Sequence, residues 1–244
     1  MANQVDTYFL INDNTENGLL EYPEWFDEDE YGDGGYYITT GEFVHHFYES
    51  GNYLHVVELS FDDPDFRMVQ PKFSVSARVN KLILTECYPL SDINTYLKFN
   101  LKFPNYDLIG SRGYLSVIQY KVVNGLTTDG DKFRVLYEAA EHGHLETVKY
   151  IIGLGINKRN SDVMCLAARR GHLTIVKYLF EEAPYSDIIL DPQSSRLRTE
   201  ISGKMNIHIY NNYAIRTCLA KDYMDLVCYL IEKGAKINRE QIFW

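Results

Sequence analysis

A short motif occurs twice in the C-terminal half of this 244-residue chain, and it constrains the fold more than any other feature. Residues 143–152 read GHLETVKYII and residues 171–180 read GHLTIVKYLF, so the copies share Gly-His-Leu-x-x-Val-Lys-Tyr. An Ala-Ala pair stands at the same distance before each glycine, at 139–140 and 167–168. A motif that recurs in this way predicts copies of one structural unit packed in a row.

Two weaker copies lie on either side of this pair. Residues 113–120 read GYLSVIQY and close with Gly125, whereas residues 222–231 read DYMDLVCYLI and close with Gly234. The spacings between equivalent first positions (113, 143, 171 and 222) are therefore 30, 28 and 51 residues. The longest spacing predicts an insertion between the last two copies, near 184–207.

The residue types within the motif predict a pair of helices. Adjacent alanines let a second helix approach closely, and the glycine ends the first helix in a left-handed conformation. The Leu-x-x-Val-x-x-Leu pattern then gives the second helix one apolar face. A single helix pair cannot cover its own apolar face, so the units are expected to stack into a solenoid.

The motif AAxxGHLxxVKYL, closing with GAxxN, resembles the second half of the ankyrin repeat. The resemblance implies about four repeats within 107–244. The chain departs from that family in the turn that opens each repeat, because residues 134–137 (RVLY), 162–165 (DVMC) and 213–216 (YAIR) replace the usual Thr-Pro-Leu-His. With spacings below about 33 residues, the fingers between repeats are expected to be short, with a tight turn at 157–160.

The ankyrin resemblance also implies where a protein partner binds. Ankyrin arrays usually bind proteins on a concave face, formed by the finger tips and the exposed positions of each first helix. By register, these positions are Glu138, Glu141, His142, Arg169, Arg170 and Lys221. They run from acidic to basic along the array. Since exposed positions contribute little to stability, replacing both Arg169 and Arg170 with glutamate is expected to leave the thermal midpoint nearly unchanged.

The N-terminal part of the chain differs from the repeats in charge. Residues 1–100 hold 18 acidic and 5 basic residues, a net charge of −13, whereas residues 101–244 carry +3. A proline at position 104 disfavours helix just before it. We therefore expect an N-terminal module at 1–98, a linker at 99–106 and repeats at 107–244. The predicted fold class is an α+β N-terminal domain followed by an all-α ankyrin-repeat solenoid.

Hydrophobic alternation within the module predicts strands at residues 35–39, 53–59 and 81–85. A helix is expected between the first two strands, capped by Thr40 and ended by Gly51, and a second helix is expected to start at Ser91. The strings GGYYIT, VVEL, KLIL and YPLSDINTY resemble the module that precedes ankyrin arrays in proteins of giant viruses of amoebae, such as Mimivirus. No activity is implied by that resemblance.

Composition excludes several classes of function. The net charge of −10 and a pI near 5.2 argue against a nucleic-acid binder that neutralises phosphates. No apolar run reaches the roughly 20 residues that span a bilayer, so no membrane is expected. The four cysteines lie apart in apolar stretches, which predicts reduced thiols in the core of a cytoplasmic protein, or of the host-cell cytoplasm if the chain is viral. The oligomeric state stays open.

Candidate metal ligands in the N-terminal module do not form a convincing site. The acidic run 27–30 with Asp33 matches only part of a calcium loop, so a solvated loop or an acidic-aromatic patch for protein partners is expected. His45 and His46 would point about 100° apart on a helix, and with His55 they are expected at the surface or rim. We expect no metal and no cofactor.

The sequence also lacks the usual signs of an enzyme. Neither a G-x-S-x-G turn nor a phosphate-binding glycine loop is present, so no catalytic residue is assigned and protein recognition is the expected function. One alternative stays open. The order GGYYIT, helix, VVEL resembles the ADP-ribosyltransferase-like fold, which implies a dinucleotide cleft beside Tyr36, Tyr37 and Glu58.

Ala168→Leu tests the register of the repeats. A leucine at one of the paired small positions should overpack the contact between helices and cost about 1–3 kcal/mol. Urea denaturation of the full chain measures this difference. An unchanged free energy of unfolding would show that the register is wrong.

Overall fold

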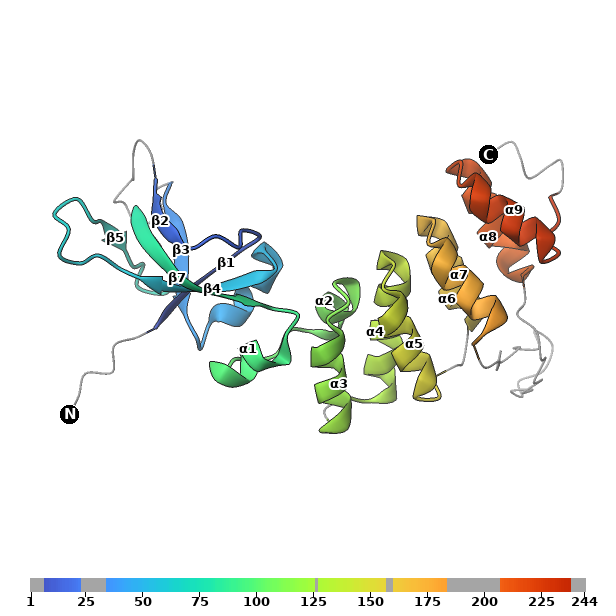
Figure 1. The fold of residues 1–244 in the computed structure, drawn as a ribbon, viewed down its shortest axis with the longest axis horizontal. Helices are drawn as coiled ribbons and strands as arrows, with labels where there is room; N and C mark the ends of the chain where they lie inside the picture. The colour runs from blue at the N-terminus through green and yellow to red at the C-terminus, as the bar shows by residue number, and fades with distance from the viewer. Residues whose placement is uncertain (1–6, 23–33, 126, 157–159, 184–206, 238–244) are drawn as a thin grey trace. The chain divides into compact units, whose positions relative to one another are not determined.

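The computed structural model describes residues 7–22, 34–125, 127–156, 160–183 and 207–237. The chain divides into two compact units, Met1–Pro104 and Asn105–Trp244, whose elements are labelled in Figure 1. Three sequence predictions lie outside the described residues. They are the acidic run 27–33, the finger tip at 157–159 and nearly all of the insertion near 184–207.

One antiparallel sheet of seven strands dominates the first unit, in the order β2-β7-β4-β1-β3-β6-β5. The strands are β1 (Tyr8–Asn12), β2 (Gly18–Glu21), β3 (Tyr36–Thr40), β4 (Tyr53–Glu58), β5 (Met68–Val69), β6 (Ser76–Val79) and β7 (Lys81–Pro89). Short helices complete the unit: the 3-10 turns η1 (Val44–His46) and η2 (Tyr48–Ser50), and α1 (Ile93–Lys98). The N-terminal unit is therefore strand-rich.

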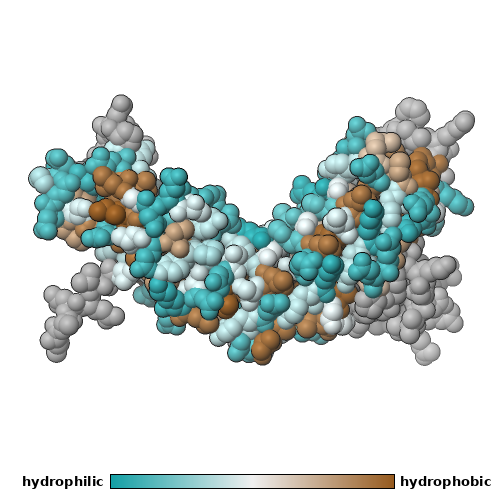
Figure 2. Space-filling view, in the orientation of Figure 1, coloured by the Kyte–Doolittle hydropathy of each residue, from teal (hydrophilic) through white to brown (hydrophobic). Residues whose placement is uncertain are grey.

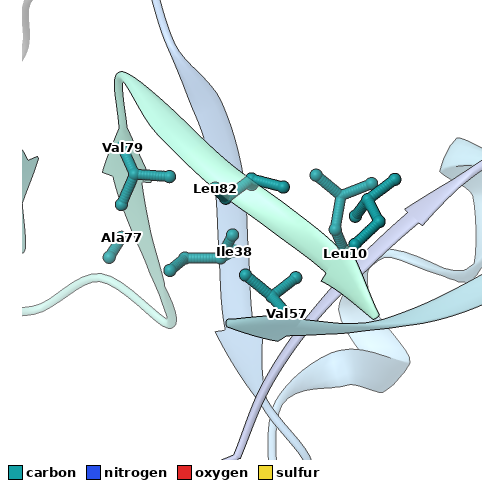
Figure 3. Packing of buried hydrophobic residues seen from close by; sticks show 7 residues of the cluster. Leu10, Ile38, Val57, Ala77, Val79 and Leu82 are labelled. Carbon is teal, nitrogen blue, oxygen red and sulfur yellow. The ribbon is translucent and has the colours of Figure 1, made fainter. Parts of the chain in front are cut away.

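Each face of the sheet carries its own apolar layer. On one face the core consists of Leu10, Ile38, Val57, Ala77, Val79, Leu82 and Leu84, most of which Figure 3 labels. On β1, Phe9 alternates with Leu10 and so points to the opposite face, where its ring meets Phe99 edge-on at 5.1 Å. Tyr48 and Tyr96 pack there too, with ring centroids 5.7 Å apart. The inner strand β1 is therefore apolar at three consecutive positions, Phe9 to Ile11, all of which are buried.

The two buried tyrosines, Tyr48 and Tyr96, lie on the face of the sheet that the short helices cover. The hydroxyl of each donates a hydrogen bond to a backbone carbonyl. Tyr48 donates its hydroxyl to the Lys102 carbonyl at 2.6 Å, and Tyr96 donates to the Leu90 carbonyl at 2.8 Å. Burial raises the pKa of Tyr48 well above its ordinary value. The first bond ties the chain after α1 to η2, and the second ties α1 to the residue that follows β7.

The three predicted strands are observed as β3, β4 and β7. The predicted stop at Gly51 is confirmed, because Gly51 is the C-cap of η2, but the helical segment begins after Thr40 and consists of 3-10 turns. Thr40 still belongs to β3 and pairs with Tyr8. At the other end, Gly51 is extended and lies so close to the Asn12 backbone that a Cβ would come within 2.1 Å of it. The chain between these fixed points forms 3-10 turns, which rise further per residue than an α-helix. At α1, Asp92 rather than Ser91 is the cap, since its side chain accepts the Asn94 N–H.

Two sequence-based expectations about which side chains are buried need correction. His55 is not at the surface: it is fully buried on the central strand β4, and its Nε2 donates to the Asn14 carbonyl at 2.8 Å. His45 is half-buried and His46 exposed, with ring centroids 4.1 Å apart. All four cysteines are free, but only Cys165 and Cys218 are buried; Cys87 is half-buried and Cys228 exposed.

The second unit consists of helices that pack in pairs (Figure 1). In chain order they are α2 (Tyr106–Ser111) with α3 (Leu115–Val123), α4 (Asp129–His142) with α5 (Leu145–Gly153), α6 (Asn160–Arg170) with α7 (Leu173–Glu181), and α8 (Ile209–Ala220) with α9 (Met224–Glu232). The first helices of successive pairs pack against one another, α2 on α4, α4 on α6 and α6 on α8. The paired alanines at 139–140 and 167–168 lie in these contacts with no exposed surface.

The turn inside each helix pair has the same backbone conformation. Gly113, Gly143 and Gly171 all have positive φ, between 65° and 90°, and Asp222 takes the equivalent place with φ of 59°. The degenerate copy at 222–231 therefore forms the same turn as the well-matched copies. Asp is one of the few residues other than glycine that adopts this conformation readily.

The first helix of the second pair begins with a capping box instead of the Thr-Pro-Leu-His turn. The Thr128 side chain accepts the Asp131 N–H at 3.2 Å, and the Asp131 carboxylate accepts the Thr128 N–H at 2.9 Å. These bonds satisfy donors that are otherwise unpaired at a helix start. The stretch 134–137 thus lies inside α4 and forms no turn.

Comparing Gly143→Ala with Gly125→Ala separates backbone strain from packing. Both glycines have positive φ, but a Cβ on Gly143 would lie 2.8 Å from His172 Cε1, whereas a Cβ on Gly125 would meet nothing within 4 Å. We expect Gly125→Ala to cost about 1 kcal/mol from backbone strain alone. Gly143→Ala should cost about 2–3 kcal/mol because His172 must also move. Equal losses in urea denaturation would contradict the packing role of Gly143.

Candidate functional site

The six predicted binding residues lie at equivalent places in three successive helix pairs. Glu138, Glu141 and His142 belong to the last turn of α4, Arg169 and Arg170 end α6, and Lys221 directly follows α8. The structure brings them together into one group, which we call the charged strip.

Glu141 is the centre of the charged strip. Its two carboxylate oxygens bind different arginines, Oε2 the Arg169 Nη2 and Oε1 the Arg170 Nη2, each at 2.7 Å. Arg170 Nε also donates to Oε1 at 3.1 Å. The Glu141 side chain is only 18% exposed. The hydrogen bond from Arg170, and then the charge of Arg169, hold the pKa of Glu141 below its ordinary value.

The other members of the charged strip are also engaged within the array. His142 Nδ1 donates to the Glu138 carbonyl at 2.9 Å and lies 3.6 Å from the Glu138 carboxylate. Lys221 Nζ donates to the Arg169 carbonyl at 2.9 Å. The ion pairs of Glu141 replace the expectation of an unchanged thermal midpoint for the Arg169→Glu, Arg170→Glu variant with an expected loss of stability, because two new carboxylates would face Glu141.

A hydrogen bond at the end of each first helix joins successive helix pairs. His144 Nε2 donates to the Ser111 carbonyl at 2.6 Å, and His172 Nε2 donates to the Glu141 carbonyl at 2.8 Å. Carbonyls only accept, so Nε2 carries the hydrogen in both rings. Both histidines therefore have a structural role, since each joins two successive helix pairs.

Lys221 replaces the histidine at the third junction. The carbonyl it binds, that of Arg169, is equivalent to those of Ser111 and Glu141. Tyr223 occupies the histidine position and instead packs its ring on Gly171, where a Cβ would come within 3.1 Å of it. Sequence reasoning treated Lys221 only as a surface residue. The sequence did contain a signal for this role of Lys221: position 223 has tyrosine where the motif has histidine, so the Arg169 carbonyl needs another donor.

The N-terminal unit holds a hollow of about 340 Å³ beside Tyr36 and Tyr37. Its walls are mostly apolar and carry no charged side chain: they consist of Phe9, Leu10, Ile11, Asn12, Leu20, Gly35, Tyr36, Tyr37, Thr39, Phe47 and Ser50. Glu58 does not line it and lies exposed at the end of β4. Among the described residues, the hollow therefore offers no carboxylate to act on a bound dinucleotide.

No other described group suggests a cofactor or membrane site. Within residues 7–22, 34–125, 127–156, 160–183 and 207–237, no cluster of three or more His, Cys, Asp or Glu side chains could hold a metal ion. None of the helices in this part of the chain is long and apolar enough to cross a membrane.

A family model that describes ankyrin repeats (3 copies) matches the chain over two overlapping segments, residues 109–190 and 136–241. The matches together cover more than half of the chain. The chain belongs to the ankyrin-repeat family. An ankyrin repeat protein of Acanthamoeba polyphaga mimivirus is 25% identical over 154 residues, which is 63% of this chain and 39% of that protein. The similarity to ankyrin proteins of giant amoebal viruses is therefore confirmed, although the chain spans only about two fifths of that relative.

Within the ankyrin array, Glu141→Gln tests the centre of the charged strip. We expect a loss of about 1–2 kcal/mol at pH 7, because both arginines lose a charged partner. A carboxyl with a lowered folded-state pKa stabilises the fold above its unfolded pKa, near 4.3, and loses that effect as the pH falls further. The difference from the natural chain should therefore shrink below about pH 4.

Glu146→Gln is the matched control for this measurement. Glu146 is 72% exposed and pairs only with Lys149 on the same helix, at 3.2 Å. Such pairs contribute less than about 0.5 kcal/mol. Denaturation curves for both variants at several pH values would contradict the role of Glu141 if its loss matched that of Glu146 or did not depend on pH.

Proposed function

We propose that the helix pairs form an ankyrin solenoid that binds a protein partner through the charged strip, without catalysis. The observation that carries the proposal is the mutual pairing of Glu141 with Arg169 and Arg170, which fixes charged side chains of two adjacent repeats relative to each other. A surface ordered before binding loses less entropy when a partner docks. Family membership supports protein binding as the general role.

The charge distribution along the strip defines the kind of partner. Glu138 contributes negative charge at one end, whereas Arg170 is half-exposed and Lys221 exposed towards the other end. Glu141 compensates one of the two arginines, so the strip carries more positive than negative charge. We infer a partner surface whose acidic part faces Arg170 and Lys221.

The N-terminal module is proposed as a second, separate part of the protein. The division of the chain at Pro104 supports a module at 1–98, a linker at 99–106 and repeats at 107–244, since α1 ends at Lys98 and α2 begins at Tyr106. The uncharged hollow beside Tyr36 favours a non-enzymatic module over an ADP-ribosyltransferase-like one. The viral origin of the relative is the reason to place the partner in the cytoplasm of an infected host cell.

Replacing Arg170 and Lys221 together with glutamine tests the charged strip as a binding surface. Arg169 remains to pair with Glu141, but the bond from Lys221 to the Arg169 carbonyl is lost, so we expect a loss of about 1 kcal/mol in stability and compare capture well below the thermal midpoint. Recovery of the partner should fall about tenfold if both cations contact it. The measurement is affinity capture from amoebae infected with a giant virus, with quantification by mass spectrometry beside the natural chain.

A matched variant controls for net charge. Lys177→Gln with Lys236→Gln removes the same two charges from exposed positions outside the strip, and it should keep the partner. Equal loss in both double variants would mean that only bulk charge matters. Undiminished capture by the Arg170 and Lys221 variant would reject the strip as the binding surface.

A further inference from the structure

The last helix among the described residues, α9, has an apolar stripe on its exposed side. Met224 is 51% exposed and Ile231 is 46% exposed, and the exposed Cys228 lies between them. Residues at i, i+4 and i+7 share one face of a helix. Hydrophobic surface is visible in the region of α8 and α9 in Figure 2. An exposed apolar stripe of this kind marks a surface that another element can cover.

Comparison with equivalent positions in earlier repeats shows what kind of face this is. Ile231 corresponds to Ile152 on α5, which is 1% exposed, and to the half-buried Phe180 on α7. Cys228 corresponds to Lys149 and Lys177. The stripe is thus on the side that receives the next helix pair elsewhere in the array.

The contact of α9 with α7 shows how such a face is covered. Tyr229 packs edge-on against Phe180, with ring centroids 6.0 Å apart, and donates its hydroxyl to Glu181 at 3.0 Å. Lys233, one turn later, binds the same Glu181 carboxylate at 3.2 Å. The covering helix therefore supplies an aromatic residue and, four residues later, a cation.

The same acceptor arrangement recurs on α9. Glu232 follows Ile231 as Glu181 follows Phe180, and it is exposed, with no ion pair to another described residue. Asp225 flanks the stripe as well. Its counterpart Glu146 pairs with Lys149, but α9 has Cys228 in place of that lysine. The stripe is therefore bordered by two carboxylates that lack a cation in the described part of the chain.

Leu219 on α8 argues against a further ankyrin repeat as the occupant. Its counterparts Ala140 and Ala168 have no exposed surface, because the next inner helix packs directly on them. Leu219 is half-buried, and its larger side chain occupies the space that such a close approach needs. The face suits a single helix lying along α9.

We propose that Met224, Cys228, Ile231 and Glu232 form a second docking surface, which binds one amphipathic helix of a protein partner. That helix presents an apolar or aromatic side chain to Ile231 and a lysine or arginine, four residues later, to Glu232. The proposal does not depend on the charged strip. It extends to α9 the pattern of contacts that α9 itself makes with α7.

A synthetic helical peptide tests this surface on the full chain. The probe is an alanine-based peptide of about 18 residues, long enough to hold a helix, with one leucine stripe and a Tyr-x-x-x-Lys pair. A second peptide has Glu in place of that Lys. Fluorescence anisotropy measures the dissociation constants, which are expected in the micromolar range because the surface is small.

Three substitutions give distinct expected outcomes. Ile231→Ser should weaken binding of the lysine peptide at least about fivefold through lost apolar contact. Glu232→Lys should weaken it about threefold to tenfold and should reverse the preference in favour of the glutamate peptide. Val123→Ser changes an 81% exposed aliphatic residue at the end of α3, and it should leave binding unchanged.

Several results would overturn the proposal. Binding that does not saturate below about 1 mM, no reversal by Glu232→Lys, or equal loss with Val123→Ser would each reject a specific helix site. Self-association of the full chain that Ile231→Ser abolishes would assign the face to a second copy. Tighter peptide binding after Ile242, Phe243 and Trp244 are replaced with serine would assign it to the chain's own last residues. Circular dichroism of each variant confirms that the fold is intact.

Discussion

The array depends on the contact between one helix pair and the next, where an aromatic ring packs on the glycine that ends the first helix; at the first two junctions this ring is an imidazole. His144 packs on Gly113 and donates to the Ser111 carbonyl, and His172 repeats this contact one helix pair later. Glycine serves two purposes here: it adopts a positive φ, and it leaves room for the ring. The buried hydrogen bond then satisfies a carbonyl that the end of the helix leaves unpaired.

Changes at this junction explain the individual character of the last repeat. Asp222 keeps the left-handed turn without glycine, and Tyr223 stacks where the histidine would stand. The carbonyl that loses its histidine is bound by Lys221 instead. The ammonium group of Lys221 therefore stabilises this junction, and the bond to the carbonyl limits how strongly it can also bind a protein partner. The pairing of Glu141 with two arginines also has two effects: it stabilises the junction between two helix pairs, and it orders the side chains of the charged strip.

The N-terminal unit is stabilised in a different way, by burial on both faces of one sheet. Inner strands such as β1 and β4 are mostly buried on both faces, because the core cluster covers one face and the short helices with their tyrosines cover the other. This explains why alternation in the sequence located β3, β4 and β7 but not the four other strands. On a sheet buried on both faces, alternation is weakened and short strands carry little signal. It also explains why His55 is buried, since a central strand has no solvent-facing side here.

The sequence by itself determined the repeat register, the left-handed turns and the small residues between inner helices, because each of these depends on local backbone geometry or on side-chain volume at a fixed spacing. It also located the six residues of the charged strip. Only the tertiary structure decided that Glu141 binds Arg169 and Arg170, that Lys221 binds a carbonyl, and that Ile231 is exposed where Ile152 is buried. These contacts join residues about 30 or more positions apart, and their formation depends on the direction in which long side chains extend from neighbouring helices. The register of the repeats determines the positions of the Cα atoms, whereas the packing between repeats determines which partner the end of each long side chain contacts.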